Sequence, residues 1–182
     1  AQVFYGAQLQ LLLYLASVLD AEPDALPAGA YYYRIQDPLL EEPEDVGEIE
    51  EQLAEKMYLK GVTLRDARII RLMDGAEPPL TLPKMITADG SFAKGKPLAG
   101  LEDMRRLLFH ARDTARELCE NMRRGDIDAA PLSDGEENGP CQRCEYAAVC
   151  RREEARPRMM DKMSFDELLR RVNEEENGEK TQ

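Results

Sequence analysis

Residues 5–19, YGAQLQLLLYLASVL, predict an apolar helix. Gln10 and Tyr14 lie four positions apart, so their polar ends can reach a common point on one side of that helix. A helix of this kind needs a sheet or another helix to cover it, and little strand is predicted in the rest of the chain. We therefore expect part of its apolar face to remain uncovered. The apolar residues that share this face at three- and four-residue spacing are Leu9, Leu12, Leu13, Ala16 and Leu19.

The remaining pattern predicts an α/β chain that is rich in helix. Apolar periodicity, aromatic runs and turn signals at Gly, Pro and Asp mark the other elements. Lys60–Leu64 is expected to form a turn followed by a short extended segment. We also expect a strand at 28–35, a helix around 48–57, a short helix at 65–73, a hairpin at 85–92, a long helix at 101–124 and a capped helix at 164–176.

The long helix at 101–124 carries an apolar stripe at three- and four-residue spacing, which is typical of a helix that packs on a core. Gly125 follows its last turn as a C-terminal stop. The residues expected to be buried in the stripe are Leu101, Met104, Leu108, Ala111, Ala115 and Leu118, and those expected to stay exposed are Arg105, Arg112 and Arg116.

Charge limits the functions that the whole surface can have. Asp and Glu outnumber Lys and Arg by 36 to 24, which gives a net charge of −12. This charge argues against nonspecific nucleic-acid binding by the whole surface and is compatible with a local basic path. From Asp37 to Glu55 nine residues are acidic and none is basic, which predicts a solvated loop leading into a helix. No apolar run approaches the length of a membrane span, so we expect no membrane partner and a cytoplasmic location.

Three cysteines lie close together near the end of the chain. Cys141, Cys144 and Cys150 form a C-x2-C-x5-C array, and three thiols within ten residues can turn toward one metal ion or iron–sulfur cluster. Four ligands are the usual complement, so the array supplies three-quarters of a site. The fourth cysteine, Cys119, lies on the apolar edge of the predicted long helix. Zinc with Cys119 as its fourth ligand is one alternative, and a redox pair or a disulfide is another.

The order of these motifs resembles a nuclease family. Gln10-x3-Tyr14 followed by C-x2-C-x5-C is similar to the C-terminal part of RecB-type nucleases, the branch of the PD-(D/E)XK superfamily with an iron–sulfur staple. Within that branch, four segments resemble the AddB subunits of bacterial AddAB-type helicase–nucleases, over roughly residues 3–151. Tyr14 and Cys141 are 127 positions apart, a separation larger than in Cas4-like exonucleases. The four segments are residues 3–15, residues 56–62, the pair Met73-Asp74, and residues 124–131 before the cysteines.

This resemblance implies a fold and a set of roles. It implies the C-terminal portion of a PD-(D/E)XK nuclease domain at 1–151, with an incomplete sheet, and a charged tail with a short helix at 152–182. Gln10 and Tyr14 would border the nuclease site. Cys141, Cys144 and Cys150 would bind a structural 4Fe–4S cluster whose fourth cysteine comes from far upstream. The Mg²⁺-binding carboxylates and the catalytic Lys of the family also lie upstream of Gln10, so we expect a fragment without nuclease activity of its own.

The resemblance also implies a biological role for the parent protein. It would be an ATP-linked exodeoxyribonuclease subunit that degrades DNA ends in double-strand break repair by recombination. Its partners would be an AddA-type helicase–nuclease subunit and DNA, in the bacterial cytoplasm. The alternatives are a zinc-binding protein-interaction module, a Cas4-like iron–sulfur exonuclease fragment, and a scaffold in which the cysteines have no ligand role.

Overall fold

The computed structural model describes residues 1–41, 46–77, 79–133, 135, 141, 144–146, 148–150 and 157–179. Its contacts divide the chain into two units. We call residues 1–13 and 106–182 the terminal unit and residues 14–105 the central unit, and each is described by itself.

The described residues form a mixed α/β chain, as predicted. The strands are short and most of the regular structure is helical. In chain order the elements are α1 (Gln10–Ala21), β1 (Gly29–Tyr32), α2 (Val46–Met57), β2 (Lys60–Leu64), α3 (Ala67–Met73), β3 (Leu98–Ala99), α4 (Leu101–Arg123), β4 (Leu132–Ser133), β5 (Arg158–Met159) and α5 (Phe165–Glu179).

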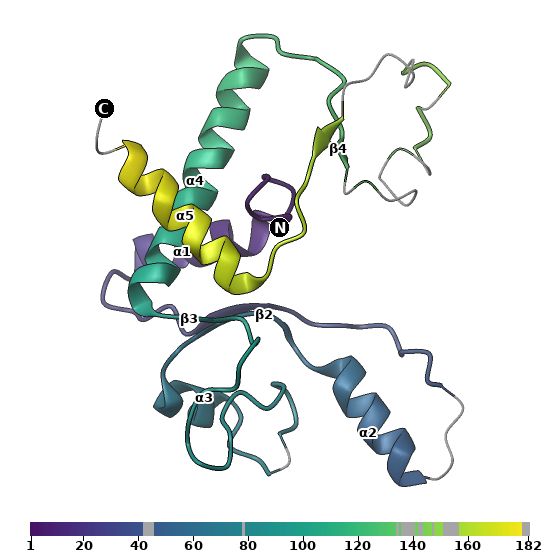
Figure 1. Ribbon diagram of the computed structural model, residues 1–182, viewed down its shortest axis with the longest axis vertical. Coiled ribbons are helices and arrows are strands. Elements are labelled where there is room, and N and C mark those ends of the chain that lie inside the picture. The colour runs from purple at the N-terminus through teal and green to yellow at the C-terminus, as the bar shows by residue number, and fades with distance from the viewer. Residues whose placement is uncertain are drawn as a thin grey trace. The chain divides into compact units, whose positions relative to one another are not determined.

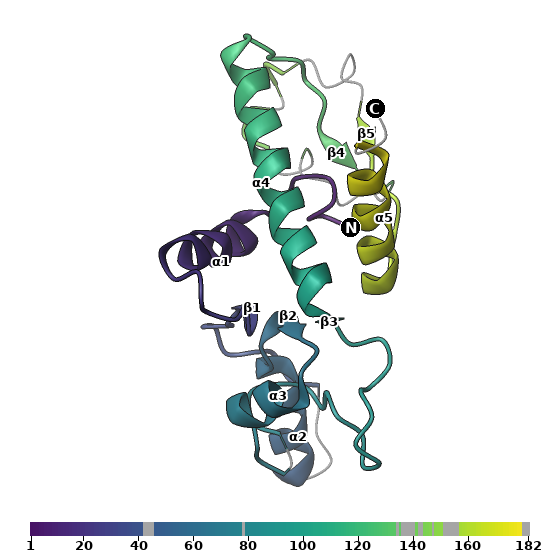
Figure 2. The ribbon, with the colours of Figure 1, turned by 90° about the vertical axis from the view of Figure 1, so that its left-hand side faces the viewer.

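A three-stranded sheet organises the central unit, with α3 packed on β2 (Figures 1 and 2). The strand order is β1-β2-β3; β1 runs antiparallel to β2, and β3 runs parallel to it. Thr63 of β2 is fully buried, and its hydroxyl accepts a hydrogen bond from the Tyr31 hydroxyl at 2.9 Å. Burial raises the pKa of Tyr31 above its ordinary value. This pair provides a hydrogen-bond partner for the hydroxyl of a fully buried threonine.

A buried cluster in the central unit joins helix α3 to strand β3. Ile70 of α3, Met85 and Leu98 of β3 form one buried cluster, against which Ile86 and Phe92 pack. The expected hairpin is present, with Ile86 and Phe92 joined by an antiparallel bridge.

Two helices organise the described part of the terminal unit, in which α5 lies against α4 (Figures 1 and 2). Leu168 and Val172 of α5 and Leu107 of α4 are buried. The α5 helix begins after Ser164, whose hydroxyl accepts a hydrogen bond from the Glu167 N–H, so the predicted cap is confirmed. Gly125 adopts a φ of 82° after α4, which confirms the predicted stop.

The predicted stripe of α4 has the right register but is incomplete. Met104, Leu108 and Ala111 are buried as expected, and Leu107 adds a buried position that the stripe does not include. The outer members Leu101, Ala115 and Leu118 are only half-buried. Arg105 and Arg116 are exposed as expected, whereas Arg112 is half-buried.

The first helix differs from its prediction in two respects. It begins at Gln10 instead of Tyr5, and its apolar face is more covered than predicted, with three residues buried and Leu13 and Leu19 half-buried. Leu9, Leu12 and Ala16 are at most 8% exposed. None of the described helices is long and apolar enough to cross a membrane.

Candidate functional site

The segment before α1 is a folded turn rather than a first turn of helix. The Gly6 N–H donates to the Val3 carbonyl oxygen at 3.1 Å, and the Ala7 N–H donates to the Gln2 carbonyl oxygen at 2.8 Å. Gly6 has a φ of 82°, in the left-handed region that favours glycine. This backbone conformation delays the start of the helix to Gln10.

Gln10 and Tyr14 lie one turn apart on α1, as predicted. Both side chains are exposed, and Tyr14 is 62% accessible. The buried residues Leu9, Leu12 and Ala16 anchor the helix in the protein. An amide and a phenol in this arrangement can donate and accept hydrogen bonds at a common polar ligand.

The described cysteines are all free thiols. Cys144 and Cys150 are exposed and Cys141 is half-buried. Cys119 is exposed on α4, so its predicted position on the apolar edge of that helix, packed on other residues, was wrong. The Val149 and Cys150 N–H groups both donate to the Tyr146 carbonyl oxygen at 3.0 and 2.9 Å, which brings Cys150 back toward Tyr146.

By type, these thiols are a suitable donor set for zinc or an iron–sulfur cluster. Among the described residues, however, no group of three or more His, Cys, Asp or Glu side chains is arranged to hold a metal ion. The structure therefore leaves both the cluster and the zinc alternative as predictions.

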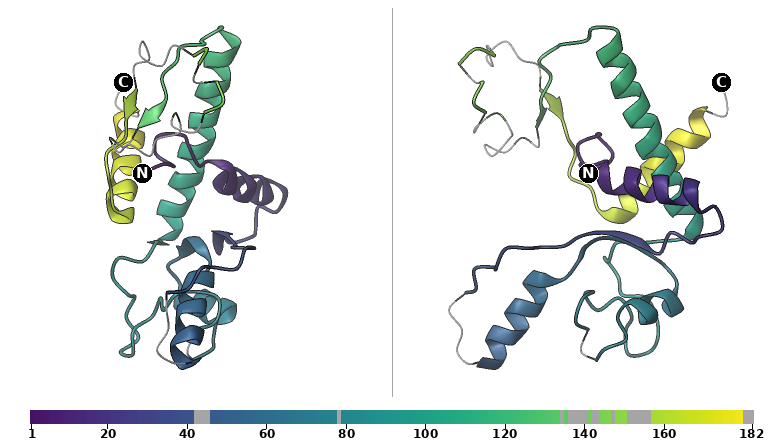
Figure 3. Two further views of the ribbon diagram at one scale, coloured as in Figure 1. Left: turned by 90° about the vertical axis from the view of Figure 1, so that its right-hand side faces the viewer. Right: turned by 180° about the vertical axis from the view of Figure 1, so that it is seen from behind.

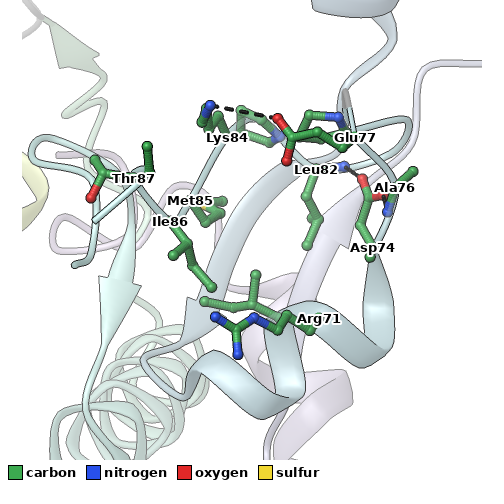
Figure 4. A pocket seen from close by; sticks show the side chains of 14 residues that line it. Arg71, Asp74, Ala76, Glu77, Leu82, Lys84, Met85, Ile86 and Thr87 are labelled. Atoms are coloured by element: carbon green, nitrogen blue, oxygen red, sulfur yellow. Dashed lines mark hydrogen bonds and ion pairs between the residues drawn. The ribbon is translucent and has the colours of Figure 1, made fainter. Parts of the chain in front are cut away.

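A hollow of about 410 Å³ lies beside α3 in the central unit (Figure 4). Its floor includes Ile70, Leu82 and Met85, and Lys84 and Glu77 form an ion pair of 3.7 Å at its rim.

Asp74 lies at the end of α3 and accepts hydrogen bonds from the loop that borders this hollow (Figure 4). Its Oδ2 atom accepts hydrogen bonds from the N–H groups of Leu80, Thr81 and Leu82, at 2.7–2.9 Å, and from the Thr81 hydroxyl at 3.1 Å. Desolvation alone would raise the pKa of Asp74, but these hydrogen bonds lower it below its ordinary value. Because its acceptor capacity is used within the loop, Asp74 is suited to a structural role.

A comparison with known proteins identifies the family of the chain. Residues 1–151 match the family model of the PD-(D/E)XK nuclease superfamily. The chain belongs to this superfamily. The match covers α1 and the cysteine segment and ends before α5 begins.

Curated relatives of this PD-(D/E)XK chain are each named as one subunit of an ATP-dependent helicase/deoxyribonuclease. The protein of Alkaliphilus metalliredigens is 29% identical over 96% of the chain, which corresponds to 16% of that protein. Those of Thermoanaerobacter sp. and Moorella thermoacetica are 35% and 38% identical over 82% and 81% of the chain, each corresponding to 14% of the relative. The resemblance to the AddB family is thereby confirmed, and the chain spans 14–16% of the length of these relatives.

Sequence reasoning missed the contacts that hold the start of α1. Tyr5 is hydrogen-bonded to Asp161, and the Phe4 ring is stacked on His110. Tyr5 and Asp161 are 156 positions apart, so no local pattern marks them as a pair.

Proposed function

We propose that this chain is part of the nuclease domain of a helicase–nuclease subunit that degrades DNA ends during double-strand break repair by recombination. The match of residues 1–151 to the nuclease superfamily carries this proposal. The name of the relatives supports the link to an ATP-dependent helicase and to deoxyribonuclease activity.

In this proposal, Gln10 and Tyr14 border the nuclease site. Their exposure at the start of α1 supports this role, because both polar ends are accessible to a DNA phosphate. They would position the phosphate or the catalytic carboxylates by hydrogen bonds. Mg²⁺, which in such enzymes activates the attacking water, would be bound by carboxylates in another part of the protein.

Cys141, Cys144 and Cys150 would bind a structural 4Fe–4S cluster in this proposal. The support is their spacing and their state as free thiols. Such a cluster would join the cysteine segment to a fourth ligand elsewhere in the protein and would stabilise the nuclease domain.

The whole subunit would also have a partner protein and a cellular location. The whole subunit would act with an AddA-type helicase–nuclease subunit on DNA in the bacterial cytoplasm. The name of the relatives, which identifies them as one subunit of an ATP-dependent enzyme, is the support for a partner subunit.

Tyr14→Phe tests the proposal in the whole subunit that carries this chain, assembled with its partner. The substitution removes only the phenol hydroxyl, so we expect slower cleavage of linear DNA and unchanged ATP-driven unwinding. Gln10→Ala should act in the same way. The measurements are single-turnover cleavage with Mg²⁺ and strand separation on the same DNA.

Two exposed residues provide matched controls: Tyr33→Phe and Gln8→Ala should leave both activities unchanged. Equal loss of cleavage and unwinding in the Tyr14 variant would assign Tyr14 to folding. The 182-residue chain alone should not degrade linear DNA with Mg²⁺ or Mn²⁺. Cleavage by the purified chain that Gln10→Ala abolishes would overturn this expectation.

A further inference from the structure

Residues 4–6, which lead into α1, are held by three segments of the terminal unit: α4, the strand region around 158–161, and α5. Figure 3 shows the N-terminal turn beside the segment that leads into α5. The superfamily match ends at residue 151, so α5 lies outside the part of the chain that the family model describes.

Tyr5 and Asp161 form a reciprocal pair. The Tyr5 hydroxyl donates to Asp161 Oδ2 at 3.2 Å and accepts from the Asp161 backbone N–H at 3.1 Å. Arg171 of α5 donates to the same Asp161 oxygen at 2.9 Å and to Glu167 at 3.1 Å. The Tyr5 ring is thereby linked to α5 through one carboxylate.

Phe4 is held from both helices. Its ring is stacked on His110 of α4, with ring centroids 5.4 Å apart, and the Arg171 guanidinium carbon lies 5.8 Å from its centroid. A ring nitrogen of His110 lies 3.3 Å from the Phe4 carbonyl oxygen, and the other ring nitrogen lies 3.3 Å from Glu175 of α5.

The next residue, Gly6, lies in close contact with α4. A Cβ on Gly6 would lie 3.1 Å from the Thr114 methyl carbon of α4, so the backbone of the turn lies directly on that helix. Only three residues separate Gly6 from Gln10. The position of the turn therefore sets where α1 begins.

The α5 helix is itself firmly attached to α4. Leu168 and Val172 are 6% and 3% exposed, and Arg106 donates to Asn173 at 2.9 Å. A helix anchored in this way can restrain a short segment that contacts it.

We propose that α5 is a positioning element for the nuclease site: the contacts of Tyr5, Asp161 and Arg171, which we call the α5 clamp, fix the start of α1 and thereby place Gln10. The nuclease part of this inference rests on the proposed function. A shift of about 1 Å in a group that positions substrate can cost about a hundredfold in rate. Loosening the clamp should therefore slow cleavage through the position of Gln10, without a change in the residues proposed to meet the DNA phosphate.

Tyr5→Phe and Arg171→Ala in the whole subunit with its partner test the clamp. We expect kcat for DNA cleavage to fall by about tenfold in each variant, with KM for linear DNA and the unwinding rate unchanged. Arg170→Ala is the matched control, because Arg170 is the neighbouring exposed arginine of α5 and pairs only with Glu167 and Glu174 among the described residues.

Hydrogen exchange in the 182-residue chain provides a readout independent of cleavage. The Gly6 and Ala7 amides should exchange faster in the two clamp variants than in the wild type or the Arg170→Ala control. Unchanged exchange in both variants would overturn the clamp. Faster exchange with wild-type kcat would overturn its role in positioning, and parallel loss of cleavage and unwinding would do the same. A wild-type subunit that fails to cleave DNA would refute the proposed function, while the exchange data would still decide whether the clamp holds the turn.

Discussion

Asp74 is the residue that holds the loop at 79–82 by hydrogen bonds. Three consecutive backbone N–H groups and one hydroxyl converge on a single carboxylate oxygen. Leu82 is buried, so loss of the acceptor of its N–H group would cost free energy comparable to a lost hydrogen bond. The resemblance to the AddB family includes the pair Met73-Asp74, and the structure supplies a physical reason for an aspartate at the second position.

Asp74→Asn should lower the free energy of unfolding by about 1 to 2 kcal/mol. An amide oxygen carries no charge, so the donors that converge on Asp74 Oδ2 exchange an anionic acceptor for a weaker neutral one. Because the folded pKa of Asp74 is lowered, the contribution of the carboxylate is complete above its unfolded pKa of about 4 and is lost as the pH falls through the folded value. The difference from the wild type should therefore shrink in acid.

Urea unfolding of both proteins from pH 7 down to pH 3 measures this effect. Glu77→Gln is the control on the same loop, since the Glu77 side chain is 84% exposed and its ion pair is long; it should change little. A pH-independent difference between wild type and Asp74→Asn would show that the carboxylate charge is not the cause.

At the scale of elements, the pairing of β1 with β2 depends on a glycine. Gly61 is opposite Tyr31 in the ladder, and a Cβ at this position would lie 1.9 Å from the Ala30 carbonyl oxygen. The obstacle is backbone, which cannot move without breaking the ladder.

Gly61→Ala should therefore destabilise the central unit by about 3 kcal/mol or more. Gly90→Ala is the contrasting variant: Gly90 has a positive φ, but its Cβ would meet no atom within 4 Å, so its cost should be about 1 kcal/mol. Thermal unfolding followed by circular dichroism can compare the two. An equal loss of stability in the two variants would mean that the β1–β2 pair can shift to accept the methyl group.

The elements that sequence could predict are those with a long local period. The α4 stripe repeats over 23 residues, and α5 has a serine cap and two buried apolar positions, so both are expected from the sequence. The strands β3, β4 and β5 have two residues each, which is too short for any period. Their existence depends on partners far along the chain, such as Ser133 beside Met159.

The candidate site also has one part that the sequence could predict and another part that it could not. Gln10 and Tyr14 share one side of a helix because of their spacing alone, and this could be predicted. The start of α1 could not, because it depends on the conformation of Gly6 and on contacts between residues 156 positions apart. The convergence of the three cysteine sulfurs also depends on more than spacing, and the described residues do not form such a group.

At the scale of the whole molecule, the cysteines provide the sharpest test of ancestry. In the whole subunit purified without air, Cys141→Ser, Cys144→Ser or Cys150→Ser should each lower bound iron and sulfide and the visible absorbance of the cluster. Cys119→Ser should leave all three unchanged, because Cys119 lies exposed on α4. Zinc without iron, lost in the Cys119 variant as well, would favour the zinc-binding alternative.

The distance along the chain between Tyr5 and Arg171 also determines when the start of α1 can be fixed during synthesis. Ribosomes add about 5 to 20 residues per second, so residues 4–6 wait for roughly ten to thirty seconds before α5 exists. Contacts of such long sequence separation form late in folding because the intervening chain must first be ordered. The nascent turn before Gln10 is thus left without Asp161 and Arg171 while the residues between them are made, and a chain cut short before residue 161 would never acquire these two partners.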